Sequence, residues 1–153
     1  KAPGSPVPAP TPAPAPTPTP SPGPSGLGTE EQEMLELVNK ERSSRGLKPL
    51  IADLALSGVA ETKSQDMVKN NYFSHQSPTY GSPFEMMERF NIAYQSAGEN
   101  IACNRTVAAA HEALMNSEGH RENILNAQYT HIGIGIVDGG PCGKMFTQMF
   151  ISK

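Results

Sequence analysis

The chain has 153 residues, a formal net charge of -3 at pH 7 and 37% hydrophobic residues. It has no basic run interleaved with aromatic residues, which argues against nucleic acid as a partner. No apolar stretch approaches the ~18 residues that a membrane-spanning helix needs, so no transmembrane segment is predicted.

The first 28 residues differ in composition from the rest of the chain. They hold 11 of the 15 prolines, mostly as Ala-Pro and Thr-Pro pairs, and their only large apolar residues are Val7 and Leu27. Such a segment cannot bury enough apolar area to offset the entropy of ordering, and alternating proline favours extended polyproline II. The sequence therefore predicts a disordered linker over residues 1–28, with a reach of up to roughly 90 Å, and one folded domain over residues 29–153. A proline-rich ligand for a partner domain is the alternative.

The first part of this domain carries two helix signals. Thr29-Glu30-Glu31-Gln32 has the pattern of a capping box, and Gly46 fits the left-handed cap that ends the helix. Between them, apolar residues recur at helical spacing at Met34, Leu37 and Val38. Asp53 is the predicted cap of a second helix. The inner face of that helix is predicted to consist of Leu56, Val59, Ala60, Met67 and the aliphatic stem of Lys63.

The rest of the chain predicts two shorter helices and three strands. Ser82-Pro83-Phe84-Glu85 is another capping box with proline at the first helical position, and residues 106–115 form an alanine-rich helix. Residues 132–137 alternate large residues with glycine, which predicts a strand whose glycine face allows close packing. Strands are also predicted over 97–102 and 144–151. Helices followed by a strand hairpin indicate an α+β fold.

Three segments set an ionisable side chain beside small or turn-forming residues. His75 follows Phe73-Ser74, Glu99 lies between Gly98 and Asn100, and His120 follows Gly119. Two imidazoles and a carboxylate are a sufficient ligand set for a divalent cation such as zinc, with an open position for water. If the fold brings them together, we expect His75, Glu99 and His120 to form a metal site. The structural alternatives are a surface-loop histidine, a hydrogen-bonded corner and a helix-terminal histidine, respectively.

Cys103 and Cys142 are the only two cysteines. With four histidines in the chain, they do not make a CxxC-type zinc cluster. We predict a disulfide between them, because the other features point to an extracellular protein. Two separate buried thiols are the alternative.

Other catalytic motifs are incomplete. His111-Glu112-Ala113-Leu114-Met115 lacks the second histidine of the zincin helix, so His111 is predicted to lie on a helix surface. Gly133 and Gly135 lack the third glycine and the helix start of a phosphate loop. No serine or cysteine lies in a nucleophile elbow. His131 precedes the isoleucine strand, and the sequence leaves open whether it faces the site.

Four motifs in a fixed order resemble those of the CAP superfamily, which comprises the cysteine-rich secretory proteins, antigen-five allergens and plant pathogenesis-related proteins. They are Asn39-x-x-Arg42-x-x-x-Gly46-Leu47-x-Pro49-Leu50, Ser74-His75, Gly98-Glu99-Asn100-Ile101-Ala102 and Ser117-x-Gly119-His120-Arg121-x-Asn123-Ile124-Leu125. The similarity covers residues 30–151, includes the strand at 132–135, and is strongest to the bacterial secreted branch.

This resemblance implies a three-layer α-β-α sandwich, with helices on both faces of a small antiparallel sheet. It also implies that His75, Glu99 and His120 line a central cleft, which in this family often holds a divalent metal such as zinc. Many members carry a tryptophan three positions before a second cleft glutamate. Here Leu114 and Ser117 stand at those positions. Either Glu118, one residue later, substitutes as fourth ligand, or a water completes the site, or three ligands form a weaker one.

Three functions are compatible with these features. We expect a secreted module, extracellular or associated with a cell wall or spore surface, whose cleft binds cell-wall material, peptide or lipid. The long loops and cysteine-rich extension of animal members are absent, which argues against transferring their sterol-binding or channel-blocking roles. The alternative is a metal-dependent hydrolase of peptide or peptidoglycan with Glu99 or Glu118 as base, although a glutamate that ligates metal cannot also transfer protons. The third is a structural, metal-free polar cluster.

Overall fold

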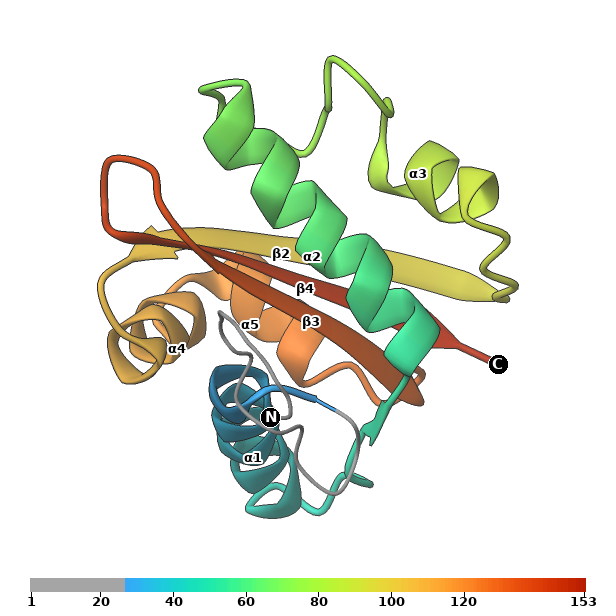
Figure 1. Cartoon of the computed structure of the whole chain (residues 1–153). Coiled ribbons are helices and arrows are strands. Elements are labelled where there is room, and N and C mark those ends of the chain that lie inside the picture. Colours follow the sequence, from blue (N-terminus) through green and yellow to red (C-terminus); the bar gives the residue numbers. More distant parts are fainter. Residues whose placement is uncertain (1–26) are drawn as a thin grey trace, which may run out of the picture.

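The computed structural model describes residues 27–153, which form three layers around one sheet (Figure 1). Two helices cover one face of the sheet and three cover the other (Figure 1). The first face carries α2 (Leu54–Lys69) and α3 (Pro83–Arg89), and the second carries α1 (Thr29–Ser43), α4 (Val107–Met115) and α5 (Glu118–Ile124). The strands are β1 (Ile51–Ala52), β2 (Ser96–Asn104), β3 (His131–Asp138) and β4 (Lys144–Ser152). The α+β sandwich expected from the sequence is confirmed, whereas the predicted linker lies outside the described residues except for Leu27 and Gly28.

The strands lie in the order β1-β3-β4-β2, which makes β2 an edge strand. β2 and β3 both pair antiparallel with β4, as the predicted hairpin requires. β1 is the exception to an antiparallel sheet, because it pairs parallel with β3 through Ile51 and Ala52. A strand of two residues has no periodicity, so the sequence did not reveal it.

The start of α1 corrects a prediction. Thr29 is already helical, and the N-cap is Gly28, which has no side chain with which to form a capping box. The amide of Gln32 instead donates to the Gly28 carbonyl at 2.9 Å. The reason lies one residue earlier, where Leu27 is 4% exposed and packs into the core, so the helix starts one position sooner. The helix ends as predicted, with Gly46 at φ +74° and the Leu47 amide donating to the Arg42 carbonyl.

The predicted caps of α2 and α3 are both present. The Asp53 carboxylate accepts from the Leu56 amide at 3.0 Å, and Ser82 and Glu85 form a capping box. α2 then lies directly on the glycine face of β3, where a Cβ at Gly135 would collide with the main chain of Ala60 and Glu61. The alternation of glycine with isoleucine thus sets how closely α2 approaches the sheet.

The core is divided by the sheet into unequal parts. On the side of α1, α4 and α5 it is one large apolar cluster that includes Met34, Val38, Leu114, Phe146 and Phe150. On the α2 side there are two smaller clusters, one around Leu56, Met86 and Met149 and another around Met67, Ile101 and Met145. Buried polar side chains lie on this second side as well, among them Lys63, Ser64 and Asp66.

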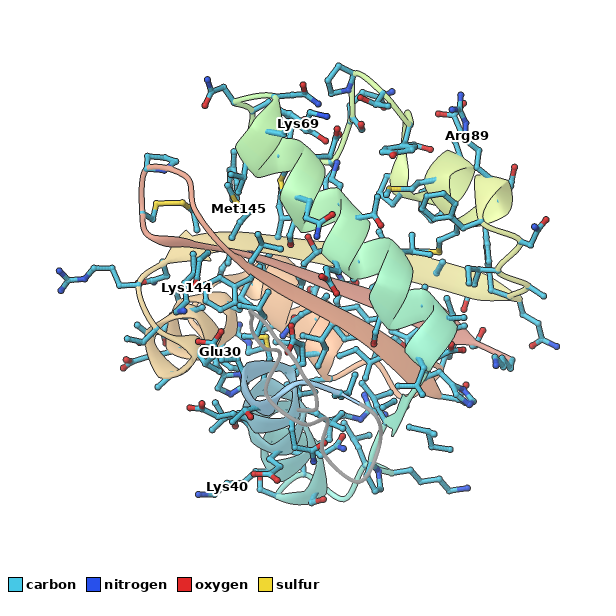
Figure 2. All side chains as sticks on the ribbon, viewed as in Figure 1. Glu30, Lys40, Lys69, Arg89, Lys144 and Met145 are labelled. Carbon is cyan, nitrogen blue, oxygen red and sulfur yellow. A yellow bond between two sulfur atoms is a disulfide. The ribbon has the colours of Figure 1, made fainter. Side chains whose placement is uncertain are left out.

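Two connections hold the β3–β4 hairpin (Figure 2). Cys103 and Cys142 form the predicted disulfide, which joins the turn to the end of β2. Nζ of Lys144 lies 2.8 Å from Oε2 of Glu30, which ties the hairpin to the start of α1. The same Nζ lies 2.6 Å from Oδ1 of Asp138, within the hairpin. Within the part of the chain that the structure describes, no helix has the length and apolar character to cross a membrane.

Candidate functional site

Glu99 lies on the edge strand β2, and its side chain is only 1% exposed. Its register partner is Met149, so it points to the α2 face of the sheet. There Glu99 Oε1 pairs with Nδ1 of His75 at 2.7 Å. His75 comes from the loop between α2 and α3, and its side chain is 53% exposed. The structure therefore brings together two of the three predicted residues in a direct imidazole–carboxylate contact.

The loop that carries His75 is anchored by a buried carboxylate, Asp66 of α2. This carboxylate accepts from Ser77 Oγ at 2.6 Å and Thr79 Oγ1 at 3.1 Å, and also from the hydroxyl of Tyr72. These bonds fix the loop on both sides of His75. Burial raises the pKa of Asp66, but the donated hydrogen bonds outweigh it and leave the pKa below the usual range.

His120 comes from α5, which packs against β2 on the other face of the sheet. Its Nδ1 pairs with Ser117 Oγ at 2.8 Å, and its main-chain oxygen accepts from Asn100 Nδ2 at 3.0 Å. Asn123 completes this network, because its Nδ2 donates to Asn100 Oδ1 at 2.8 Å and to the Glu99 carbonyl at 3.3 Å. The two asparagines of the sequence motifs thus tie α5 to the edge strand.

The environment of His120 favours its neutral form. Burial lowers the pKa of His120, and the positive charge of a protonated His75 lowers it further. His120 therefore stays neutral to a lower pH than a free imidazole does. We call His75, Glu99, His120 and Ser117 the edge site.

The edge site contains a buried polar atom without a partner. Glu99 Oε2 makes no hydrogen bond with any described residue, although it is shielded from solvent. Buried carboxylate oxygens are almost always hydrogen-bonded, so this atom marks a place for a water, an ion or a ligand group. Gln148 Nε2, on the neighbouring strand β4, is also buried without a hydrogen-bond partner among the described residues.

The predicted metal ligands do not form a preassembled cage. Over residues 27–153, no group of three or more His, Cys, Asp or Glu side chains is arranged to hold a metal ion. Glu118 is exposed at the first residue of α5, and no described hydrogen bond or ion pair joins it to the edge site. The metal-binding roles of these residues remain predictions.

The other two histidines lie outside the edge site. The prediction for His111 is wrong: it is 6% exposed, and its Nε2 pairs with Glu41 Oε2 at 3.2 Å, because α4 packs against α1 rather than facing solvent. His131, at the start of β3, pairs with Thr130 Oγ1 at 2.7 Å. Its register partner on β4 is Ile151, two positions along from Met149, and β4 separates its strand from the one that carries Glu99.

Two features near the edge site were not predicted. Lys63 is 1% exposed, and its Nζ donates to the main-chain oxygen of His75 at 3.1 Å; the sequence indicated only its aliphatic stem. A cavity of about 470 Å³ lies beside the disulfide, lined by Met67, Tyr72, Phe73 and Met145 among others. The residues that line the cavity come from three separate segments of the chain, so no local sequence pattern predicts it.

Comparison with known proteins identifies one family. The model of the cysteine-rich secretory protein family, CAP, matches residues 35–150. The "Uncharacterized protein YkwD" of Bacillus subtilis strain 168 is 56% identical over 124 residues, covering 80% of this chain and 47% of YkwD. The chain thus spans about half the length of this relative.

Two solved structures share the fold. An extracellular protein containing a SCP domain from Bacillus anthracis matches with a TM-score of 0.76 and 42% identity, over 81% of this chain and 40% of that chain. An outer surface protein of Borrelia burgdorferi matches with a TM-score of 0.75, over 81% of this chain and 92% of that chain. At 18% identity, this second likeness concerns the fold alone.

Proposed function

Because the chain belongs to the cysteine-rich secretory protein family, CAP, we propose that it is an extracellular or cell-surface binding module. Its edge site would bind a ligand with the help of a divalent cation, for which zinc is the first candidate. The proposal for its location is supported by the extracellular protein of Bacillus anthracis, which shares the fold at 42% identity.

One observation carries the proposal for the cation, namely that both imidazoles have their Nδ1 atoms engaged. His75 Nδ1 is held by Glu99 and His120 Nδ1 by Ser117. Metal-binding histidines commonly give one ring nitrogen to a carboxylate or another oxygen, which fixes the tautomer and orients the other nitrogen toward the ion. His75 and His120 would therefore bind through Nε2.

The chemistry of the site fits a cation in this form. Two neutral imidazoles suit zinc and leave positions for water or an exogenous ligand. In this arrangement Glu99 orients His75 instead of binding the ion, and its unpaired Oε2 gives it capacity for one more polar contact. A bound cation would supply a Lewis-acidic contact for a carbonyl or carboxylate of the ligand.

The electrostatics of His120 favour the same role. An imidazole ligates only when it is neutral, and burial together with the charge of His75 lowers the pKa of His120. The site is therefore competent at neutral pH. We expect cation binding to weaken as the pH falls below ~6.5, the range in which exposed histidines become protonated.

The test is a calorimetric zinc titration at pH 7.5 of the full chain and three variants. His75→Ala and His120→Ala should each abolish measurable binding, and Glu99→Gln should weaken it by about 10- to 100-fold, as loss of an orienting carboxylate does elsewhere. His131→Ala is the matched control, because it removes an imidazole away from the edge site. Equal affinity in the chain and all variants would reject the site, as would loss of binding in His131→Ala alone.

A further inference from the structure

Lys63 buries an ammonium group beneath the loop of the edge site. It lies in the middle of α2, on the helix face toward the sheet, and is 1% exposed. Its Nζ donates to the main-chain oxygen of His75 at 3.1 Å and lies 5.0 Å from the centre of the Tyr72 ring. Both of these contacts are with the loop that presents His75.

Two carboxylates act on this ammonium group electrostatically. Glu99, on β2, and Asp66, on the same helix, both raise the pKa of Lys63, although desolvation dominates and lowers it. An ammonium group stays buried only when opposite charges or hydrogen bonds compensate for the lost water. Glu99 is in the converse position, since its carboxylate is buried and Oε2 has no hydrogen-bond partner among the described residues.

Lys63 and Asp66 have complementary contacts along the loop. Asp66 holds the segments on either side through Tyr72, Ser77 and Thr79. Lys63 holds the main chain at His75 itself. The position of the imidazole relative to Glu99 therefore depends on a bond from α2 as well as on the imidazole–carboxylate contact.

We infer that Lys63 is a positioning residue of the edge site: it holds the His75 main chain so that Nδ1 meets Glu99. The inference rests on the proposed function in treating His75 as a binding residue. The inference can be tested in the absence of a cation, because His75 should keep a single tautomer only as long as Lys63 holds the loop.

The experiment uses the full chain with ¹⁵N-labelled histidine at pH 8. Long-range ¹H–¹⁵N spectra report the tautomer of each ring. His75 in the unchanged chain should show the proton on Nδ1. In Lys63→Met, which keeps the length and the packing of the stem, its signals should move toward those of a free imidazole, while those of His111 and His131 stay in place. The zinc dissociation constant should rise by about tenfold or more, as it does when outer-shell support is lost.

Ser64→Ala is the matched control. Ser64 is the next residue and is fully buried, but its hydroxyl bonds to Gly135 and Thr147 of the sheet, not to the loop. This variant should leave the His75 signals unchanged. If the His75 signals in Lys63→Met remain at their original positions, or move no more than in Ser64→Ala, then Lys63 is merely structural and the inference is overturned.

The two proposals fail separately. If the unchanged chain binds no zinc but Lys63→Met shifts the His75 signals, the positioning role stands and the cation is rejected. If Lys63→Met and Ser64→Ala bind zinc as tightly as the unchanged chain and the His75 signals do not move, the positioning role is rejected and the cation stands. Should Lys63→Met not fold, Lys63→Gln replaces it. Its shorter, neutral amide should shift the His75 signals in the same direction by a smaller amount, and no shift would overturn the inference.

Discussion

The sheet separates two buried cations that are held in different ways. On the α1 side, Arg42 is 1% exposed and directs its guanidinium to main-chain oxygens of Lys48, Ile124, Asn126 and Tyr129. On the α2 side, the equally buried Lys63 bonds to one main-chain oxygen, that of His75, and the carboxylates of Glu99 and Asp66 act to raise its pKa.

This difference indicates that the two sides of the sheet have different roles. A guanidinium is a rigid fork of five donors, so Arg42 can fasten several loop carbonyls at once, in the midst of the large apolar cluster. An ammonium group is a compact charge on a flexible stem, and here it lies among groups that can ionise. The α1 side therefore serves mainly stability, whereas the α2 side also sets the geometry of the edge site.

The largest effect is expected on the α1 side. Arg42→Met removes the guanidinium donors from the carbonyls of Ile124 and Asn126, and leaving a buried acceptor unpaired costs ~1–3 kcal/mol. We expect the free energy of unfolding to fall by about 4 kcal/mol in urea denaturation followed by circular dichroism. Lys63→Met should cost less than half as much. Equal costs would show that the two cations are not used differently.

The next effect concerns the contact between α2 and the sheet. Gly135→Ala forces a methyl group into the main chain of α2 and should lower the free energy of unfolding by about 3 kcal/mol, as overpacking does. Gly58→Ala is the matched control. Gly58 lies on α2, and nothing lies within 4 Å of the atom that this substitution adds. It should stabilise the protein by about 0.5–1 kcal/mol, because alanine favours the helix. Thermal unfolding of both variants measures these effects. If Gly135→Ala lowers the free energy of unfolding only slightly, α2 can shift to accommodate the methyl group.

The smallest effect depends on pH and tests the α2 side. Asp66 has a pKa below the unfolded value of 3.8, so it contributes stability that is complete above about pH 4 and is lost as the pH falls through its lower folded pKa. Asp66→Asn should lower the free energy of unfolding by about 2 kcal/mol at pH 7, the worth of hydrogen bonds to a charged group. The difference from the unchanged chain should shrink below pH 4.

Asp138→Asn provides the comparison for this experiment, since its side chain is 82% exposed and pairs with Lys144 at the surface. Such surface pairs contribute ~0–1 kcal/mol, so its unfolding curve should hardly change between pH 7 and pH 3 relative to the unchanged chain. If Asp66→Asn keeps a constant difference at every pH, the buried carboxylate does not stabilise the loop as a charged acceptor.

Much of the fold could be predicted because its signals are local. The caps at Asp53 and Ser82, the glycine at position 46 and the alternation in residues 132–137 all act within a few residues of themselves. The predictions that failed depended on contacts between residues that are far apart in the sequence. Leu27 entered the core and moved the start of α1, and Glu41 of α1 paired with His111 of α4.

The sequence by itself determined the α+β class and the identity of the polar residues, because spacing and residue type encode them. It predicted the disulfide but left two separate thiols open, and the structure decided for the bridge. Only the tertiary structure decided which of those residues meet. It joined His75 to Glu99, oriented His120 through Ser117, and left Glu118 exposed. It also placed the ammonium group of Lys63, for which the sequence predicted only an aliphatic stem on the inner face of the helix, under the loop as a buried support. The physical reason is that periodicity fixes the face on which a side chain lies, while its partner is chosen by helices and loops that pack around the sheet from distant parts of the chain.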